Sequence, residues 1–331
     1  MGFEINARYL HKKESALEII NDINKFPKLE YPVVTIGRFD GVHLGHKKLI
    51  ERLKNIAKEN LGQSVIISFN PSPEEVLYAS ENKKIRLLNI QQEKEELLRN
   101  LGIDYLLILP FTAAFSKITS ETFIREYLVE KIHLRELVVG FSHHFGYDRE
   151  GDFLQLDSLG EKHGFRVNEI PMEDIQNRNI TAVKIRKFLK DGLIKEANDL
   201  LGYPYSISGR VIQGNQIGRT ISYPTANIDV KDKYKNKLIP KQGVYAVLVQ
   251  CCNNQYKGMA NIGYRPTLKL VKHELTTEVH LFNFSHEIYN ENLTIYFIQR
   301  IRNEVKFDSL QQLKEQLAKD QHRSLLLLAD D

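Results

Sequence analysis

The residues best suited to chemistry lie in one stretch, Gly209 to Asn227, which reads GRVIQGNQIGRTISYPTAN. Closely spaced glycines let the backbone turn tightly and bring its N–H groups close to an anion. Arg219 and Thr220 directly follow Gly218, and a cation and a hydroxyl at these positions suit phosphate oxygens or a magnesium ion. The stretch therefore predicts a phosphate site, with a plain glycine-rich connection between two strands as the alternative.

The end of this stretch, PTAN, adds a candidate metal site. Pro224 fixes a turn, and Thr225 and Asn227 are two residues apart, so they share one face of an extended segment. A hydroxyl and an amide oxygen on one face suit a hard cation that also binds phosphate. A Walker loop is excluded, because Gln213 stands where that loop needs glycine and the lysine is absent.

A second group of candidate residues lies in residues 37–46, which read GRFDGVHLGH. His43 and His46 are three apart and face the same way on a first helical turn, where the helix N-terminus favours an anion. Gly45 lets a ligand approach the backbone. Two imidazoles over a phosphate can stabilise the charge that develops during phosphoryl transfer. The alternatives are one core and one solvated histidine, or a zinc site, which lacks a third ligand nearby.

The elements around the histidines alternate between strands and helices, which predicts a parallel sheet covered on both faces. Ligands bind such sheets beyond the carboxyl ends of the strands, where the histidine stretch lies. The predicted strands are 31–37, 64–69, 105–109, 136–140 and 164–170. The predicted helices are 15–23, 44–60, 94–101 and 120–131, the last with Ser120 as its N-cap.

The pattern changes in the second half of the chain. Two short helices, each ended by a glycine, are predicted between Ile180 and Gly202. Closely spaced strands then predict an antiparallel barrel or sandwich, followed by an amphipathic helix that begins at Phe307-Asp308-Ser309. The predicted strands are 205–211, 243–250, 255–262, 276–284 and 293–301.

Length and composition limit the number of domains and the kinds of partner to be expected. A chain of 331 residues with 42% hydrophobic and 27% charged residues predicts two domains with full cores. The net charge is only +4, and the basic residues are interspersed with acidic ones, so we expect no nucleic-acid partner. Cys251 and Cys252 are adjacent and would point to opposite faces of a strand, so a structural disulfide is not expected. With no signal peptide and no membrane-spanning run, we expect a cytoplasmic protein; a homo-oligomer is left open.

Both groups of residues resemble one family. FDGVHLGH resembles the HxGH nucleotidyltransferases, specifically the FAD synthetase half of the bacterial bifunctional riboflavin kinase/FMN adenylyltransferases. GRVIQGNQIGRTISYPTAN resembles the riboflavin kinase half, and the resemblance runs from Pro32 to Asp320. It implies an α/β Rossmann-like nucleotidyltransferase domain (1–186), linker helices (187–204), and a six-stranded, mainly antiparallel β-barrel domain with a C-terminal helix (205–331).

In the first half, the resemblance implies transfer of the adenylyl group of ATP to FMN, with release of pyrophosphate. His43 and His46 would be the catalytic residues. The expected ATP and phosphate contacts are Asp40, Gly41, Gly45 and Arg186, and the expected flavin contacts are Phe69, Asn70 and Phe145.

The chain departs from the family pattern at several positions of this half. Asparagine is replaced by Arg38, histidine by Ser72, aspartate by Ser142, and a serine and a threonine by Ala182 and Val183. The alternative is therefore a riboflavin kinase whose first domain serves as a nucleotide- or flavin-binding or assembly module. A third class, an HxGH transferase acting on another phosphorylated substrate, is disfavoured by the intact segments PTAN (224–227) and TTEVH (276–280).

In the second half, the resemblance implies phosphorylation of riboflavin by ATP with Mg²⁺, so riboflavin, FMN and FAD would be substrates and products. Glu278 takes the position of the catalytic base. It alternates with apolar residues and shares one face of a strand with His280. The alternative is an acidic side chain on the solvent-exposed face of a barrel. Arg302 would contact the flavin, or else form a surface ion pair. Thr225 and Asn227 would hold the metal, and the phosphate loop would comprise Gly214, Gly218, Arg219 and Thr220.

Overall fold

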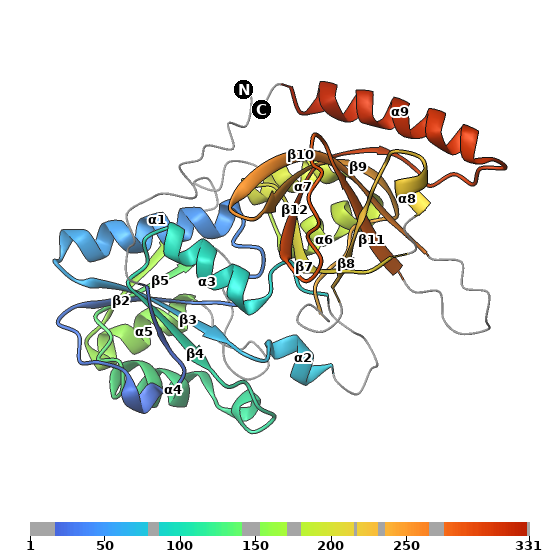
Figure 1. Cartoon of the computed structure of the whole chain (residues 1–331). Helices are drawn as coiled ribbons and strands as arrows, with labels where there is room; N and C mark the ends of the chain where they lie inside the picture. Colours follow the sequence, from blue (N-terminus) through green and yellow to red (C-terminus); the bar gives the residue numbers. More distant parts are fainter. Residues whose placement is uncertain are drawn as a thin grey trace. The chain divides into compact units, whose positions relative to one another are not determined.

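The computed structural model describes residues 17–78, 86–140, 153–170, 180–214, 217–230, 236–264 and 275–329. The chain divides into two compact units, and the division falls between Thr181 and Ala182 (Figure 1). Each unit is described by itself.

The first unit is built on a six-stranded parallel sheet in the order β1-β4-β3-β2-β5-β6. From β2 the chain moves to one side for β3 and β4, and to the other for β5 and β6. Ligands bind parallel sheets at such a reversal, so the loop after β2 is in the position for a site. The strands are β1 (Glu18–Ile20), β2 (Pro32–Ile36), β3 (Gln63–Phe69), β4 (Tyr105–Leu109), β5 (Glu136–Gly140) and β6 (Arg166–Ile170).

Helices cover both faces of this sheet and bury one hydrophobic core on each. Figure 1 shows α1 and α3 on one face and α4 and α5 on the other. The helices are α1 (Leu44–Glu59), α2 (Pro73–Leu77), α3 (Gln91–Asn100), α4 (Ser120–Phe123) and α5 (Phe153–His163), with 3-10 turns η2 (Ile23–Lys25) and η4 (Phe115–Lys117) and a π-helix η5 (Ile124–Val129).

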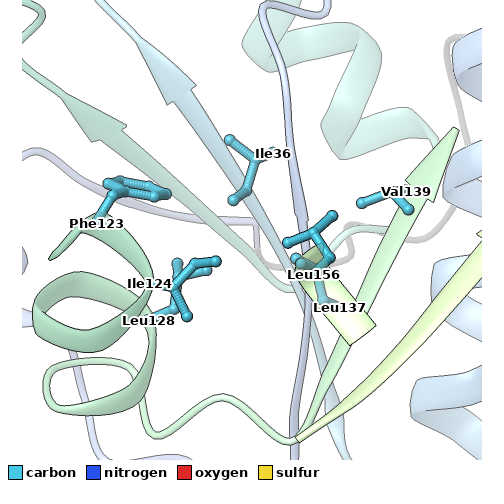
Figure 2. A pocket seen from close by; sticks show the side chains of 7 residues that line it. All are labelled: Ile36, Phe123, Ile124, Leu128, Leu137, Val139 and Leu156. Carbon is cyan, nitrogen blue, oxygen red and sulfur yellow. The ribbon is translucent and has the colours of Figure 1, made fainter. Parts of the chain in front are cut away.

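A small cavity lies in one of these cores, between the sheet, η5 and α5 (Figure 2). Its volume is about 10 Å³, which is barely the space of one water molecule. Its lining is entirely apolar: Ile36, Phe123, Ile124, Leu128, Leu137, Val139 and Leu156. We regard it as a packing defect of the core and not as a ligand site.

One helix prediction in this unit was wrong, and a second needs correction at its N-cap and in its helix type. Where residues 15–23 were expected to be helical, the structure has strand β1, because adjacent Ile19 and Ile20 pair with the free edge of β4. The N-cap of α4 is Thr119, whose hydroxyl accepts a hydrogen bond from Thr122 N–H at 3.2 Å, and not Ser120. The expected helix 120–131 also changes to π geometry after Phe123, with Glu130 N–H donating to the carbonyl of Arg125.

The second unit is a closed barrel of six antiparallel strands in the order β10-β11-β8-β7-β12-β9. The short strand β8, which begins in the PTAN segment, was absent from the predicted strands. The strands are β7 (Ser206–Ile212), β8 (Ala226–Asp229), β9 (Gly243–Cys251), β10 (Asn254–Tyr264), β11 (Leu275–Leu281) and β12 (Asn292–Arg302).

Helices α6 (Ala182–Asp191) and α7 (Ile194–Leu201) belong to the same compact unit as the barrel. The buried side chain of Asn198 joins α7 to the barrel, since it donates to the carbonyl of Phe297 and accepts from Tyr205 N–H, both at 2.8 Å. Gly202 ends α7 in the left-handed conformation, with φ of 70°.

The last helix, α9 (Leu310–Leu327), packs on the outside of the barrel. Ser309 caps it through a hydrogen bond from Gln312 N–H to its hydroxyl, within the predicted start. At its far end, Leu328 is buried against Ala246 and Leu248 of β9. The helix is therefore fixed to the strands at its C-terminal end.

Candidate active sites

The histidine pair of the first unit lies where β2 gives way to α1. His43 is the N-cap of α1, and its Nδ1 accepts a hydrogen bond from His46 N–H at 3.3 Å. The two imidazole rings stack with centroids 3.7 Å apart and planes 12° apart, and Phe39 lies against His46. The predicted pair is thus brought together at a helix N-terminus.

Burial sets the charge of this pair. It lowers the pKa of His43 to about 4, and it lowers the pKa of His46 well below its usual value, helped by the neighbouring cations. Both rings are therefore neutral near pH 7. Because Nδ1 of His43 is an acceptor, its proton sits on Nε2, where it can be donated to a ligand. His46 Nδ1 is buried and has no hydrogen-bond partner among the described residues.

Lys94 of α3, which belongs to no sequence motif, adds a buried cation to this site. It is 8% exposed, and its ammonium donates to the hydroxyl of Ser68 at 3.2 Å. Its charge is one of the reasons why the pKa of His46 is low, and burial lowers the pKa of Lys94 itself. A bound polyphosphate would favour the charged forms of all these groups. The buried position follows from tertiary packing, which gives no signal in the sequence.

The loop before the histidines is held by Asp40. Asp40 is 5% exposed, and its carboxylate accepts hydrogen bonds from the N–H groups of Leu88 at 2.8 Å and Asn89 at 3.2 Å. Gly41 has a φ of 86°, which favours glycine, and a Cβ on Gly45 would lie 3.2 Å from His43 Nδ1. All three predicted residues therefore shape the loop that presents the histidines.

Phe69, predicted to contact the flavin, ends β3 and packs against Phe111 and Phe115, with ring centroids 5.6 Å and 5.8 Å away. The neighbouring Asn70 donates its N–H to the carbonyl of Leu109. The two predicted residues thus lie beside an aromatic cluster at the carboxyl end of β3.

The two departures from the family pattern nearest this loop are structurally connected. Ser72 precedes α2, where its N–H donates to the carboxylate of Glu75 at 2.9 Å, while its hydroxyl is buried without a partner among the described residues. Arg38 forms an ion pair with Glu74 of the same helix. Arg38 therefore ties the histidine loop to α2, a link that the sequence alone did not indicate.

The structure does not test two predicted residues of this site. Phe145, together with Ser142, falls outside the described residues. Arg186 is half-buried on α6, in the second compact unit. Their roles stay predictions.

In the second unit, β8, β11 and β10 place three polar residues side by side. Glu278 is in register with Asn227 on one side and with Asn261 on the other, so the three side chains share one face of the sheet. Thr225 donates its hydroxyl to Glu278 Oε2 at 3.3 Å. The predicted base and the two predicted metal ligands are thus neighbours. Asn261 was not predicted, because its position depends on long-range strand register.

The predicted phosphate loop closes over this row of residues. A Cβ on Gly214 would overlap the side-chain amide of Asn227, and one on Gly218 would overlap the carbonyl of Tyr223. Both positions therefore require glycine for close approach. Tyr223 N–H donates back to the carbonyl of Gly218 at 2.8 Å, which closes the turn before PTAN.

Arg219 and Thr220 lie in the short helix α8 (Ile217–Thr220) and are exposed. The guanidinium of Arg219 donates to Glu287 at 3.0 Å and to the hydroxyl of Tyr289 at 3.2 Å. These contacts hold Arg219 at the surface of the loop.

His280 supports the turn that carries Thr225. Its Nδ1 is 2.7 Å from the carbonyl of Pro224, and Tyr223 packs edge-on against its ring. Burial lowers the pKa of His280, so the neutral ring donates from Nδ1 to that carbonyl. The alternation of Glu278 and His280 along β11 was the sequence signal for this residue.

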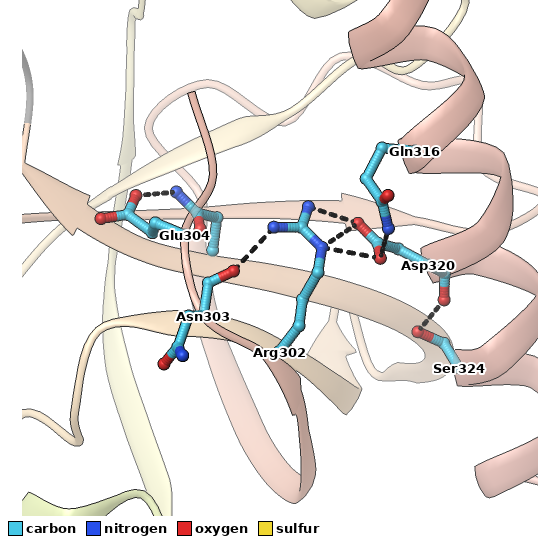
Figure 3. Close-up of polar contacts among 7 residues, drawn as sticks. Arg302, Asn303, Glu304, Gln316, Asp320 and Ser324 are labelled. Carbon is cyan, nitrogen blue, oxygen red and sulfur yellow. Dashed lines mark hydrogen bonds and ion pairs between the residues drawn. The ribbon is translucent and has the colours of Figure 1, made fainter. Parts of the chain in front are cut away.

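Arg302, predicted to contact flavin, is bound to α9 in the structure (Figure 3). Its guanidinium donates to both oxygens of Asp320, with distances of 2.6 to 3.0 Å, and to the carbonyl of Asn303. Asp320 is 2% exposed and also accepts from Gln316. Arg302 therefore fixes the helix, and its contact with flavin stays a prediction.

A groove of about 470 Å³ opens beside this contact, within the second unit. Glu304 lines it and accepts a hydrogen bond from Asn261 at 3.1 Å, which connects the groove to the row containing Glu278. The groove is lined by Lys190, Ile239, Pro240, Lys241, Gln242, Tyr264, Leu275, Asn303 and Glu304.

Each of the two units matches the model of a known protein family. Residues 26–184 match the model of the FAD synthetase family, and residues 201–328 match that of the riboflavin kinase family. The chain belongs to the bifunctional riboflavin kinase/FMN adenylyltransferase family. The family resemblance and the fold class are thereby confirmed, and the presence of both domains supports two activities over the kinase-only alternative.

Relatives in this family match along nearly the whole chain. A bifunctional riboflavin kinase/FMN adenylyltransferase of Buchnera aphidicola subsp. Schizaphis graminum is 40% identical over 92% of this chain and 96% of its own. One of Listeria monocytogenes is 37% identical over 95% of both chains.

A solved structure also matches the chain. The crystal structure described as a macrolide-efflux protein from Streptococcus pneumoniae matches with a TM-score of 0.81 at 31% identity, covering 92% of this chain and 97% of that one. In the part of the chain that the structure describes, no helix is long and apolar enough to cross a membrane.

Proposed function

We propose that this chain makes FAD from riboflavin in two steps. The barrel unit transfers the γ-phosphoryl group of ATP to riboflavin, and the first unit transfers the adenylyl group of a second ATP to FMN, with release of pyrophosphate. The contact between Thr225 and Glu278 carries the proposal, because it puts a carboxylate base beside the phosphate loop within the unit that matches riboflavin kinases.

In the kinase step, Glu278 accepts the proton of the flavin's primary hydroxyl as that oxygen attacks the phosphoryl group. The N–H groups of the glycine turn and Arg219 hold the phosphates of ATP. The groove that Glu304 lines is our candidate for the flavin ring, since Asn261 links that residue to the base.

Magnesium fits the residues at this site. Thr225 and Asn227 offer neutral oxygens on one sheet face, and Mg²⁺ commonly takes few protein ligands and completes its coordination with phosphates and water. No group of three or more His, Cys, Asp or Glu side chains suited to a metal occurs among the described residues, so phosphate oxygens would supply much of the ligand set. When bound, the ion neutralises charge on the transferred phosphoryl group.

In the adenylyltransferase step, a phosphate oxygen of FMN attacks the α-phosphorus of ATP and pyrophosphate leaves. His43 and His46 donate hydrogen bonds to the phosphates as negative charge grows on them, with the positive field of Lys94 behind them. The histidines need not form a covalent bond. ATP and the flavins are the proposed small-molecule substrates, and the cytoplasm is the proposed compartment.

Product analysis with the purified chain, ATP and magnesium tests this function. With riboflavin as substrate we expect FMN and then FAD, and with FMN as substrate we expect FAD and pyrophosphate. Formation of FMN without any FAD would establish the kinase-only alternative. No phosphorylation of riboflavin would overturn both.

A further inference from the structure

The only two cysteines of the chain, Cys251 and Cys252, stand side by side at the tip of the β9–β10 hairpin. The sequence predicted that they would point to opposite faces of a strand. In the structure their Sγ atoms are 3.4 Å apart. That prediction was wrong, because only Cys251 belongs to β9 and Cys252 begins the turn.

The turn explains how the two sulfurs meet. Cys251 pairs with Asn254 across the hairpin, which leaves Cys252 and Asn253 as a two-residue loop. Both loop residues have positive φ, 50° and 64°, as a type I′ turn requires. A cysteine rarely adopts this conformation, and here it folds the Cys252 side chain back towards its neighbour.

The two thiols differ in access. Cys252 is exposed, whereas Cys251 is 1% exposed at the end of β9, in register with Leu293 of β12. A reagent therefore meets Cys252 first and finds the second sulfur within 3.4 Å. The second bond then forms within one molecule, at high effective concentration.

We propose that Cys251 and Cys252 form a vicinal dithiol site for a trivalent organoarsenical. In the reaction with phenylarsine oxide, each S–H bond breaks, two S–As bonds form, and the oxide oxygen leaves as water with both thiol protons. Arsenic stays trivalent throughout, so the step needs no oxidant or reductant.

A disulfide fits this geometry less well than a bridging atom does. Bonded sulfurs are about 2.04 Å apart, and the Cα atoms of disulfides are usually roughly 4.4 to 6.8 Å apart. The peptide between Cys251 and Cys252 is trans, since the only cis peptide among the described residues joins Asn70 and Pro71. Neighbouring Cα atoms across a trans peptide are about 3.8 Å apart. A bridging arsenic atom leaves the sulfurs closer to their present separation.

Zinc also fits less well. Structural zinc takes four ligands and needs thiolates. Among the described residues, no group of three or more His, Cys, Asp or Glu side chains could hold a metal. Burial also raises the pKa of Cys251 to about 12, which disfavours the thiolate. An organoarsenical has only two positions to exchange with thiols and reacts with loss of water.

The test is titration of the reduced, folded chain with phenylarsine oxide. We expect one equivalent to remove both free thiols, to add one phenylarsenic group by intact mass, and to resist excess glutathione but not 2,3-dimercaptopropanol. The Cys252→Ser variant should bind phenylarsine oxide at least roughly a hundredfold more weakly, because the intramolecular second bond is lost. Riboflavin phosphorylation by this variant should be unchanged, which checks its fold.

Three results would overturn the proposal. One is capture only in urea, which would mean that the folded hairpin keeps the sulfurs apart. The second is full glutathione-resistant capture by Cys252→Ser. The third is displacement of the organoarsenical by equimolar Zn²⁺. The exposed position of Cys252 makes this variant the safer test, and Cys251→Ser serves as the second variant.

Discussion

Glu278 is the proposed general base for the phosphorylation of riboflavin. Its carboxylate is held by Thr225 and stands beside Asn227. A general base contributes roughly a hundredfold to ten-thousandfold in rate. We expect Glu278→Gln to reduce FMN formation by about that factor, while FAD formation from added FMN persists. The matched control is Glu315→Gln, on the exposed surface of α9, which should have neither effect. Full-rate phosphorylation by Glu278→Gln would remove it from the mechanism.

His280 acts through its hold on the carbonyl of Pro224, one residue before Thr225. We expect His280→Leu to raise the KM for magnesium-ATP about tenfold, the equivalent of one lost hydrogen bond, and to change the KM for riboflavin little. His280→Asn keeps a donor near the position of Nδ1 and should recover part of the loss. Equal effects of both variants on both substrates would indicate a general packing role.

The histidine pair makes the first unit sensitive to acid. His43 has a folded pKa of about 4, below the usual 6.5, so its contribution to stability is present above pH 6.5 and is lost as pH falls towards 4. The shift corresponds to roughly 3 kcal/mol at the acid end. We expect urea unfolding of the chain to show this loss, and His43→Gln to reduce the slope against pH. ATP should move the histidine titration upward in NMR, since phosphate favours the charged ring.

At the scale of elements, the glycine turn leaves little space for a side chain. A Cβ on Gly214 would collide with the amide of Asn227. We expect Gly214→Ala to reduce FMN formation at least about tenfold by displacing that amide, at a cost comparable to a lost hydrogen bond. FAD formation from FMN by the same sample is the internal control. Wild-type phosphorylation by Gly214→Ala would mean that the turn is not fixed as described.

One ion pair, between Arg302 and Asp320, contributes to holding helix α9 on the barrel. Asp320 is almost fully buried, and removal of one partner of a buried pair costs about 3–5 kcal/mol. Asp320→Ala should therefore lower the urea midpoint of the barrel unit and speed hydrogen exchange along α9. The double variant Arg302→Met, Asp320→Leu should recover part of the stability, because no unpaired charge remains. Loss without any recovery would mean that the pair is not what holds the helix.

The sequence predicted strands with a continuous apolar run well, but it missed helix α5 and the short strands β1 and β8. Strand β4 was predicted with its observed bounds, because a run of buried apolar residues has few alternatives. Strands β1 and β8 have only three or four residues, and their partners define them. The candidate site followed the same division: Glu278 and Thr225 could be predicted from motifs, whereas Lys94 and Asn261 depend on packing and strand register.

At the scale of the whole molecule, the two proposed activities reside in separate compact units. We expect a chain with Glu278→Gln and a chain with His46→Ala to complement each other when mixed, so that riboflavin is converted to FAD through free FMN. A chain carrying both changes should make neither product. Liquid chromatography of the flavins would follow all three species over time. No FAD from the mixture, with each single activity intact, would mean that FMN does not pass between chains.

The contact between Arg302 and Asp320 also bears on how the protein is made. The barrel strands leave the ribosome before α9 does, and Asp320 and Leu328 are among the last described residues to be synthesised. During translation, β9 and β12 therefore lack the helix that covers them, while the first unit already has all its strands. A nascent chain halted just before residue 310 should already resist protease in its first unit, whereas its barrel should gain that resistance only in chains that also contain α9.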